Sequence, residues 1–139
     1  MTLGPIQTQW IANLRAYPER QTDHCLGEET KDSYCACCLG ELLLTKCRYE
    51  GKELPFDSSG DLYDIDPDNE TSRELALLIS SYKELGLHTE HGRIVTHRKV
   101  FIGKTTPLSL VDANDNGATW PEIADFVEAN PGLVFTRSV

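Results

Sequence analysis

The chain has 139 residues, a net charge of −9 and a sequence pI near 4.8. This length fits one domain with a buried core. The composition, with 40% hydrophobic and 25% charged residues, is that of a globular protein and excludes a chain that is disordered throughout. The acidic balance argues against a protein that tracks nucleic-acid phosphates and against adhesion to an anionic membrane. We therefore expect no direct nucleic-acid binding and no membrane association, whereas binding to a basic protein surface is permitted.

The N-terminal sequence MTLGPIQTQW lacks the basic head and apolar run of a secretion signal, and no stretch approaches a membrane span in length. Without such a signal, the five cysteines are expected to be reduced thiols of a cytoplasmic protein. The sequence predicts a single domain over residues 1–139.

Two helices are predicted in the N-terminal part of the chain, separated by a polar loop over residues 18–33. Apolar residues on one helical face predict the first over 6–17, and Pro18 ends it. These residues are Ile6, Trp10, Leu14 and Tyr17. The second is predicted over 35–45 by a stripe of Cys35, Cys38, Leu39 and Leu42. Gly40 inside that stripe indicates that a neighbouring element approaches closely.

Residues 53–70 predict an acidic surface loop, because the segment holds seven acidic residues, no basic residue, and Pro, Ser and Gly. A solvated loop explains this composition, and so does a contact site for a basic partner or mimicry of nucleic acid. The candidate partner-binding residues are Asp57, Asp61, Asp64, Asp66 and Asp68.

Two capping boxes mark helix starts in the C-terminal part. Thr71 with Glu74 predicts a helix over 72–85 that ends at Gly86, and Thr119 with Glu122 predicts a last helix that ends near Asn130. β-Branched residues predict a strand over 93–102, or a short hairpin turning near His97, and residues 133–135 predict a final strand. The fold class is therefore α+β: a mostly helical single domain with a small two- or three-stranded sheet.

Three groups of residues are candidate metal or catalytic sites. Cys25, Cys35, Cys38 and Cys47 are a candidate zinc site, since Cys35-x-x-Cys38 has the spacing by which two thiolates hold one ion. No second paired motif is present, so burial of cysteine in the core is the main alternative, and a redox dithiol is another. We expect no bound metal or cofactor.

The histidines His88, His91 and His97 are also potential ligands, but loop histidines exposed to solvent are the simpler interpretation. A small enzyme with a pocket of His88, Glu90 and Asp112 remains an alternative function.

The turn Asp112-x-Asn114-x-Asn116-Gly117 matches the start of a calcium-binding loop. Ile123 stands where the bidentate acid belongs, so a simple turn is the alternative.

Three pieces of the chain together resemble a family of small proteins of tailed phages and prophages. They are Trp10…Leu14-Arg15…Tyr17…Gln21, then Tyr34 followed by Cys37-Cys38-Leu39-Gly40, and Asn114-Asp115…Gly117-x-Thr119-Trp120-x-Glu122-Ile123-Ala124…Glu128. The chain departs from that pattern at Asn13, Glu41 and Asn116, and residues 48–105 match no part of it. The resemblance implies a phage-encoded protein acting inside an infected bacterial cell, and it supplies no catalytic residues.

From these observations we expect a non-enzymatic accessory protein. It would bind a host protein or sequester a small molecule, as in counter-defence or host takeover. A structural zinc protein and a small enzyme of unknown class are the alternatives.

Overall fold

The computed structural model of the chain describes residues 1–62 and 82–139. Its fold is α+β, with helices packed around one core and a two-stranded antiparallel sheet. In chain order the elements are α1 (Pro5–Ala16), the 3₁₀ helix η1 (Pro18–Arg20), β1 (Gly27–Glu29), β2 (Tyr34–Ala36), α2 (Cys38–Tyr49), α4 (Leu110–Asp115), α5 (Trp120–Ala129) and α6 (Pro131–Val134).

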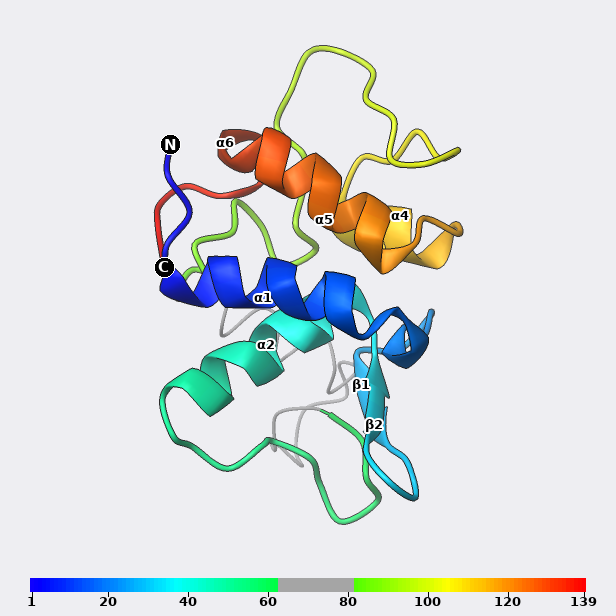
Figure 1. Cartoon of the computed structure of the whole chain (residues 1–139). Helices are drawn as coiled ribbons and strands as arrows, with labels where there is room; N and C mark the ends of the chain where they lie inside the picture. The colour runs from blue at the N-terminus through cyan, green and yellow to red at the C-terminus, as the bar shows by residue number, and fades with distance from the viewer. Residues whose placement is uncertain (63–81) are drawn as a thin grey trace, which may run out of the picture.

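Helix α1 lies between α2 and α5 and packs against both (Figure 1). Its buried face carries Trp10 and Leu14, whereas Tyr17, predicted on that face, is exposed. The Trp10 ring meets Phe135 edge-to-face at a centroid distance of 5.9 Å, and its indole nitrogen donates to the Cys38 carbonyl at 2.8 Å. One aromatic side chain thus joins α1, the start of α2 and the C-terminal segment.

Helix α5 confirms the capping box. The Thr119 backbone N–H donates to Glu122 Oε1 at 3.0 Å, and the Glu122 N–H donates to Thr119 Oγ1 at 3.3 Å. The four side chains predicted to face the core are all buried: Trp120, Ile123, Ala124 and Val127.

The predicted start of the second helix was wrong. Helix α2 begins at Cys38, because residues 34–36 pair with residues 27–29 as the two strands of the sheet. The segment 18–33, expected to be a loop, therefore supplies β1. The close approach at Gly40 is confirmed: a Cβ added to Gly40 would overlap the backbone carbonyl oxygen of Leu26.

Two predicted strands are absent from the described residues. Residues 93–102 are irregular, with a bend at 97–98 and isolated bridges at Arg93–Ser109 and Ile102–Thr105, because no strand among the described residues lies beside them to pair with their backbone. Residues 131–134 form the short helix α6, which Pro131 starts, and Phe135 makes a single bridge to Leu87.

The predicted helix over 72–85 falls almost wholly outside the described residues, and so does its capping box. Residues 82–86 form a turn, with Gly86 at φ +76°. In the described part of the chain no helix has the length and apolar character needed to cross a bilayer.

Candidate functional site

The four candidate zinc ligands occupy different surroundings. Cys38 is buried and its thiol donates to the Leu110 carbonyl at 3.5 Å, whereas the half-buried Cys35 donates to Glu28 Oε1 at 3.6 Å. Cys25 and Cys47 are also half-buried. Across residues 1–62 and 82–139, no group of three or more His, Cys, Asp or Glu side chains could hold a metal ion.

Burial keeps the thiols of α2 protonated. It raises the pKa of the Cys37 thiol to about 12 and the pKa of Cys38 well above its usual value, with the adjacent Cys37 adding to the second shift. Burial, reinforced by a hydrogen bond to Glu41, likewise raises the pKa of Tyr34 to about 12.

These raised pKa values predict alkaline destabilisation. Well below pH 9 the folded and the unfolded chain both hold these protons, so the free energy of unfolding has its full value. Above it the unfolded chain releases protons that the folded chain retains, and the free energy of unfolding falls. Urea unfolding should show a loss of about 4–5 kcal/mol between pH 8 and about 10.5, with a shallower slope for Cys38→Ala. A flat profile over this range would contradict the buried-thiol description.

The three residues of the alternative enzyme pocket each contact other groups. His88 Nε2 lies 3.3 Å from the Gly132 carbonyl oxygen, Glu90 lies beside His91, and Asp112 accepts the Leu108 N–H at 3.0 Å. Within the described residues no hydrogen bond or ion pair joins His88, Glu90 and Asp112.

The predicted calcium turn is a helix end with a buried asparagine. Residues 110–115 form α4, and Asn114, 2% exposed, accepts hydrogen bonds from Gln21 Nε2, the Cys38 N–H and Trp120 Nε1. Its amide nitrogen donates to the Thr22 carbonyl at 2.7 Å. Because both polar atoms of the Asn114 side chain bond to protein groups, the side chain joins segments rather than binding a cation.

The described part of the acidic loop, residues 53–62, is a turn organised by one carboxylate. Asp57 Oδ1 accepts the N–H groups of Ser59 and Asp61 at 2.9 and 2.8 Å. The other candidate partner-binding residues, Asp64, Asp66 and Asp68, lie outside the described residues.

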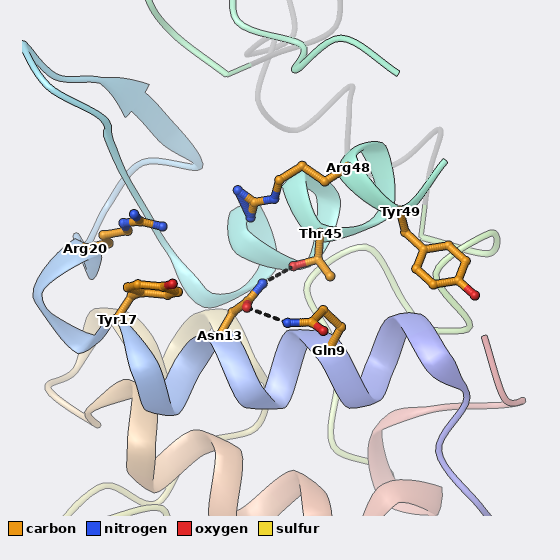
Figure 2. A pocket seen from close by; sticks show the side chains of 7 residues that line it. All are labelled: Gln9, Asn13, Tyr17, Arg20, Thr45, Arg48 and Tyr49. Atoms are coloured by element: carbon orange, nitrogen blue, oxygen red, sulfur yellow. Dashed lines mark hydrogen bonds between the residues drawn. The ribbon is translucent and has the colours of Figure 1, made fainter. Parts of the chain in front are cut away.

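A groove of about 390 Å³ runs between α1 and the second half of α2 (Figure 2). Its lining residues are Gln9, Asn13, Tyr17, Arg20, Thr45, Arg48 and Tyr49. Tyr17 and Arg20 lie at one end of the groove and Tyr49 at the other, with Asn13 and Thr45 between them (Figure 2). This volume falls in the range of small-molecule sites.

The polar side chains on the floor of the groove, Gln9, Asn13 and Thr45, are hydrogen-bonded within the protein. Gln9 Nε2 donates to Asn13 Oδ1 at 2.9 Å, and Asn13 Nδ2 donates to Thr45 Oγ1 and Glu41 Oε1, both at 3.2 Å. Thr45 in turn donates to the Glu41 carbonyl at 2.7 Å. The floor is therefore fixed in geometry, and the groups left for a ligand lie at the rim.

Beneath the rim, a buried carboxylate holds Arg48 in place. The Glu41 side chain is 1% exposed, and it accepts hydrogen bonds from Arg48 Nη2 at 2.8 Å and from the Tyr34 hydroxyl at 2.7 Å. Arg48 also donates to Tyr34 from both terminal nitrogens, at 2.9 and 3.0 Å. The Arg48 charge is therefore compensated, and removing it would leave the Glu41 charge buried without its ion-pair partner.

Arg20 differs from Arg48 in its electrostatics. Its guanidinium lies 4.1 Å from the Tyr17 ring centroid and 4.9 Å from that of Tyr34, and it donates to the Tyr34 hydroxyl at 3.2 Å. In the part of the chain that the structure describes, Arg20 forms no ion pair with a carboxylate. The aromatic contacts orient a cation whose charge remains available at the groove.

Sequence reasoning missed this groove, because its residues come from three separate segments. One signal was present: Glu41 is an acid inside the apolar run CCLGELLLT, so it needs a buried partner, and Arg48 lies two helical turns later on the same face. Nothing comparable singled out Arg20, which stands in a polar stretch.

Comparison of this chain with protein-family models, with curated proteins and with solved structures finds no match. The chain is therefore placed by its α+β class, and its function has to be inferred from the groove itself.

Proposed function

We propose that the chain is a non-enzymatic binding protein that sequesters a small anionic molecule carrying a planar ring. The observation behind this proposal is the Arg20 guanidinium at the mouth of the α1–α2 groove, without an ion-pair partner among the described residues. In a chain of net charge −9, an uncompensated arginine held between two aromatic rings is suited to hold an anion.

The composition of the groove favours binding over catalysis. Its lining residues include no histidine, cysteine or carboxylate, the groups that most often act as general acids, bases and nucleophiles. Arginine, amide and hydroxyl groups mainly hold and orient a ligand.

The ring in the ligand is inferred from the exposed tyrosines. Tyr17 is 40% exposed and Tyr49 is 60% exposed, at opposite ends of the groove (Figure 2). Exposed aromatic side chains beside a cation favour stacking with a planar group. From Gln9 in α1 to Tyr17 at its C-cap the helix rises about 12 Å, enough for a ring joined to one anionic group.

The biological setting of this proposal comes from the sequence resemblance. A phage or prophage protein of this kind would act in the bacterial cytoplasm and withdraw a small host molecule after infection. The sequence leaves two forms of binding open: sequestering a small molecule and capping a basic protein surface. The cationic rim of the groove favours the small molecule, because it would repel a basic surface.

Isothermal titration calorimetry with AMP, cyclic AMP and indole acetate tests the proposal. We expect at least one aromatic anion to bind. Adenosine has a ring without an anionic group and inorganic phosphate has an anionic group without a ring, so both should bind more weakly. Arg20→Gln should weaken binding by about 10- to 100-fold, because a charge-assisted hydrogen bond contributes about 1.5–3 kcal/mol.

Arg98→Gln is the control, since it removes the same charge from an exposed loop outside the groove and should leave binding unchanged. If none of the aromatic anions binds, or if both variants lose affinity equally, the proposal is wrong.

A further inference from the structure

A second surface, separate from the groove, has the opposite charge to the whole chain. Residues 91–109, named here the basic loop, contain Arg93, Arg98, Lys99 and Lys104 and no acidic residue. Three acids lie next to it: Glu90 beside His91, Asp112, which accepts the Leu108 N–H, and Glu122, which accepts the Thr119 N–H and lies against Gly103.

The basic loop also exposes large apolar side chains. Val95 is 47% exposed, Phe101 64% and Leu108 79%, although a chain of this kind would ordinarily bury them. Lys99 Nζ lies 5.6 Å from the Phe101 ring centroid, so one cation sits beside the exposed ring. Exposed apolar side chains on the same loop as basic residues are typical of an interaction surface.

Main-chain hydrogen bonds hold both ends of the basic loop. The Ile94 N–H donates to the Leu108 carbonyl and the Leu110 N–H to the Gly92 carbonyl, both at 2.9 Å, and the Val95 N–H donates to Leu133 at 2.8 Å. The Ile94 and Ile102 side chains are buried and anchor the loop. Val95 and Leu108 are therefore presented by a held backbone, which lowers the entropic cost of binding a partner.

The basic loop projects beyond α5 and α6, at the opposite end of the molecule from residues 50–62 (Figure 1). Those residues carry Glu50, Glu53, Asp57 and Asp61 against a single Lys52. The two ends thus differ in charge, and an anionic partner is steered towards the basic loop.

We propose that the basic loop is a docking site for an acidic protein segment that carries apolar side chains. Its charge calls for an anionic partner, and its three exposed apolar side chains call for one with apolar groups to bury. Two of the three are aliphatic, which favours protein side chains over nucleotide bases, since bases bind mainly by stacking on aromatic rings.

A second copy of the chain is a poorer partner. If two copies paired through their basic loops, four positive charges of one would face four of the other and repel them. If the basic loop paired with the acidic end of another copy, the contact would not close and the molecules would form an open chain.

Fluorescence anisotropy with a labelled random copolymer of glutamate and tyrosine tests the docking site. Labelled polyglutamate of the same length supplies charge without apolar groups, and oligothymidylate is the nucleic-acid probe. We expect the copolymer to bind several-fold more tightly than polyglutamate, with an affinity that falls as salt is raised.

Two double variants separate charge from apolar contact. Arg98→Gln with Lys99→Gln should weaken binding of both polypeptides by about tenfold at low salt. Phe101→Ser with Leu108→Ser should remove the advantage of the copolymer and leave polyglutamate binding unchanged. The groove variants Arg20→Gln and Tyr49→Ser are matched controls, and we expect neither to have an effect.

Failure of the copolymer to bind would overturn the proposal. Equal binding of copolymer and polyglutamate in the unaltered protein would also overturn it, because the apolar side chains would then contribute nothing. Tighter binding of oligothymidylate than of the copolymer would assign the loop to single-stranded nucleic acid instead.

Discussion

Replacing Asn114 with alanine is expected to lower the free energy of unfolding by about 3–5 kcal/mol. The change would leave the Cys38 N–H, the Trp120 indole N–H and the Thr22 carbonyl without their partner. Each buried polar group that loses its hydrogen bond costs about 1–3 kcal/mol, and relaxation recovers part of the sum. Urea unfolding monitored by tryptophan fluorescence measures the loss.

Asn116→Ala is the matched control in the same turn. Asn116 is exposed and its amide donates to the Asp112 carbonyl and carboxylate, so its loss should cost less than about 1 kcal/mol. Asn114→Asp, which keeps the acceptor and loses the donor to Thr22, should fall between the two. Equal costs for Asn114→Ala and Asn116→Ala would show that Asn114 does not join the segments as described.

Gly40→Ala is the second substitution with a large expected effect. Alanine favours a helix interior over glycine by about 1 kcal/mol, so local propensity alone predicts stabilisation. The added Cβ would overlap the Leu26 carbonyl oxygen, however, and that oxygen is held by the Cys37 N–H at 3.0 Å. A backbone atom cannot rotate away, so we expect a net loss of about 3 kcal/mol or more.

Gly132→Ala in α6 is the control, because a Cβ there would meet nothing within 4 Å. This variant should be neutral or slightly stabilised in thermal unfolding. Loss of folded protein for Gly40→Ala alone agrees with the contact between α2 and Leu26, whereas similar melting temperatures for both variants would contradict it.

The α+β class and two helices could be predicted from the sequence because their signals are local. The stripe through Ile6, Trp10 and Leu14 defines the buried face of α1, and the Thr119–Glu122 box defines the start of α5. Such signals act within one or two helical turns, and the packing of α1 between α2 and α5 uses the same faces.

The strands could not be predicted, because pairing decides them. The sequence Gly27-Glu28-Glu29 has little β propensity, yet it forms β1 because Tyr34–Ala36 lies alongside it. The segment 93–102 has the propensity but lacks a neighbouring strand among the described residues, and its backbone is irregular instead. Strand propensity is a property of the surroundings more than of the residues themselves.

The candidate zinc and calcium residues show the same limit. Cys38 and Asn114 were singled out by spacing, but the structure joins them to each other, with Asn114 Oδ1 accepting the Cys38 N–H at 3.1 Å. This hydrogen bond connects α2 with α4 across more than seventy residues of sequence.

By itself, the sequence determined the fold class, the buried faces of α1 and α5 and the cap of α5, because these features depend on residues that are close in sequence. It also determined the close approach at Gly40, because only glycine lacks the Cβ that would block it. Only the tertiary structure decided which polar side chains are buried in networks and which remain at a surface. Arg20 and Arg48 both lie beside Tyr34, yet one is compensated by Glu41 and the other has no ion-pair partner among the described residues. That difference arises from the packing of α1, η1 and α2, because burial and charge pairing are set by contacts between segments that sequence order keeps apart.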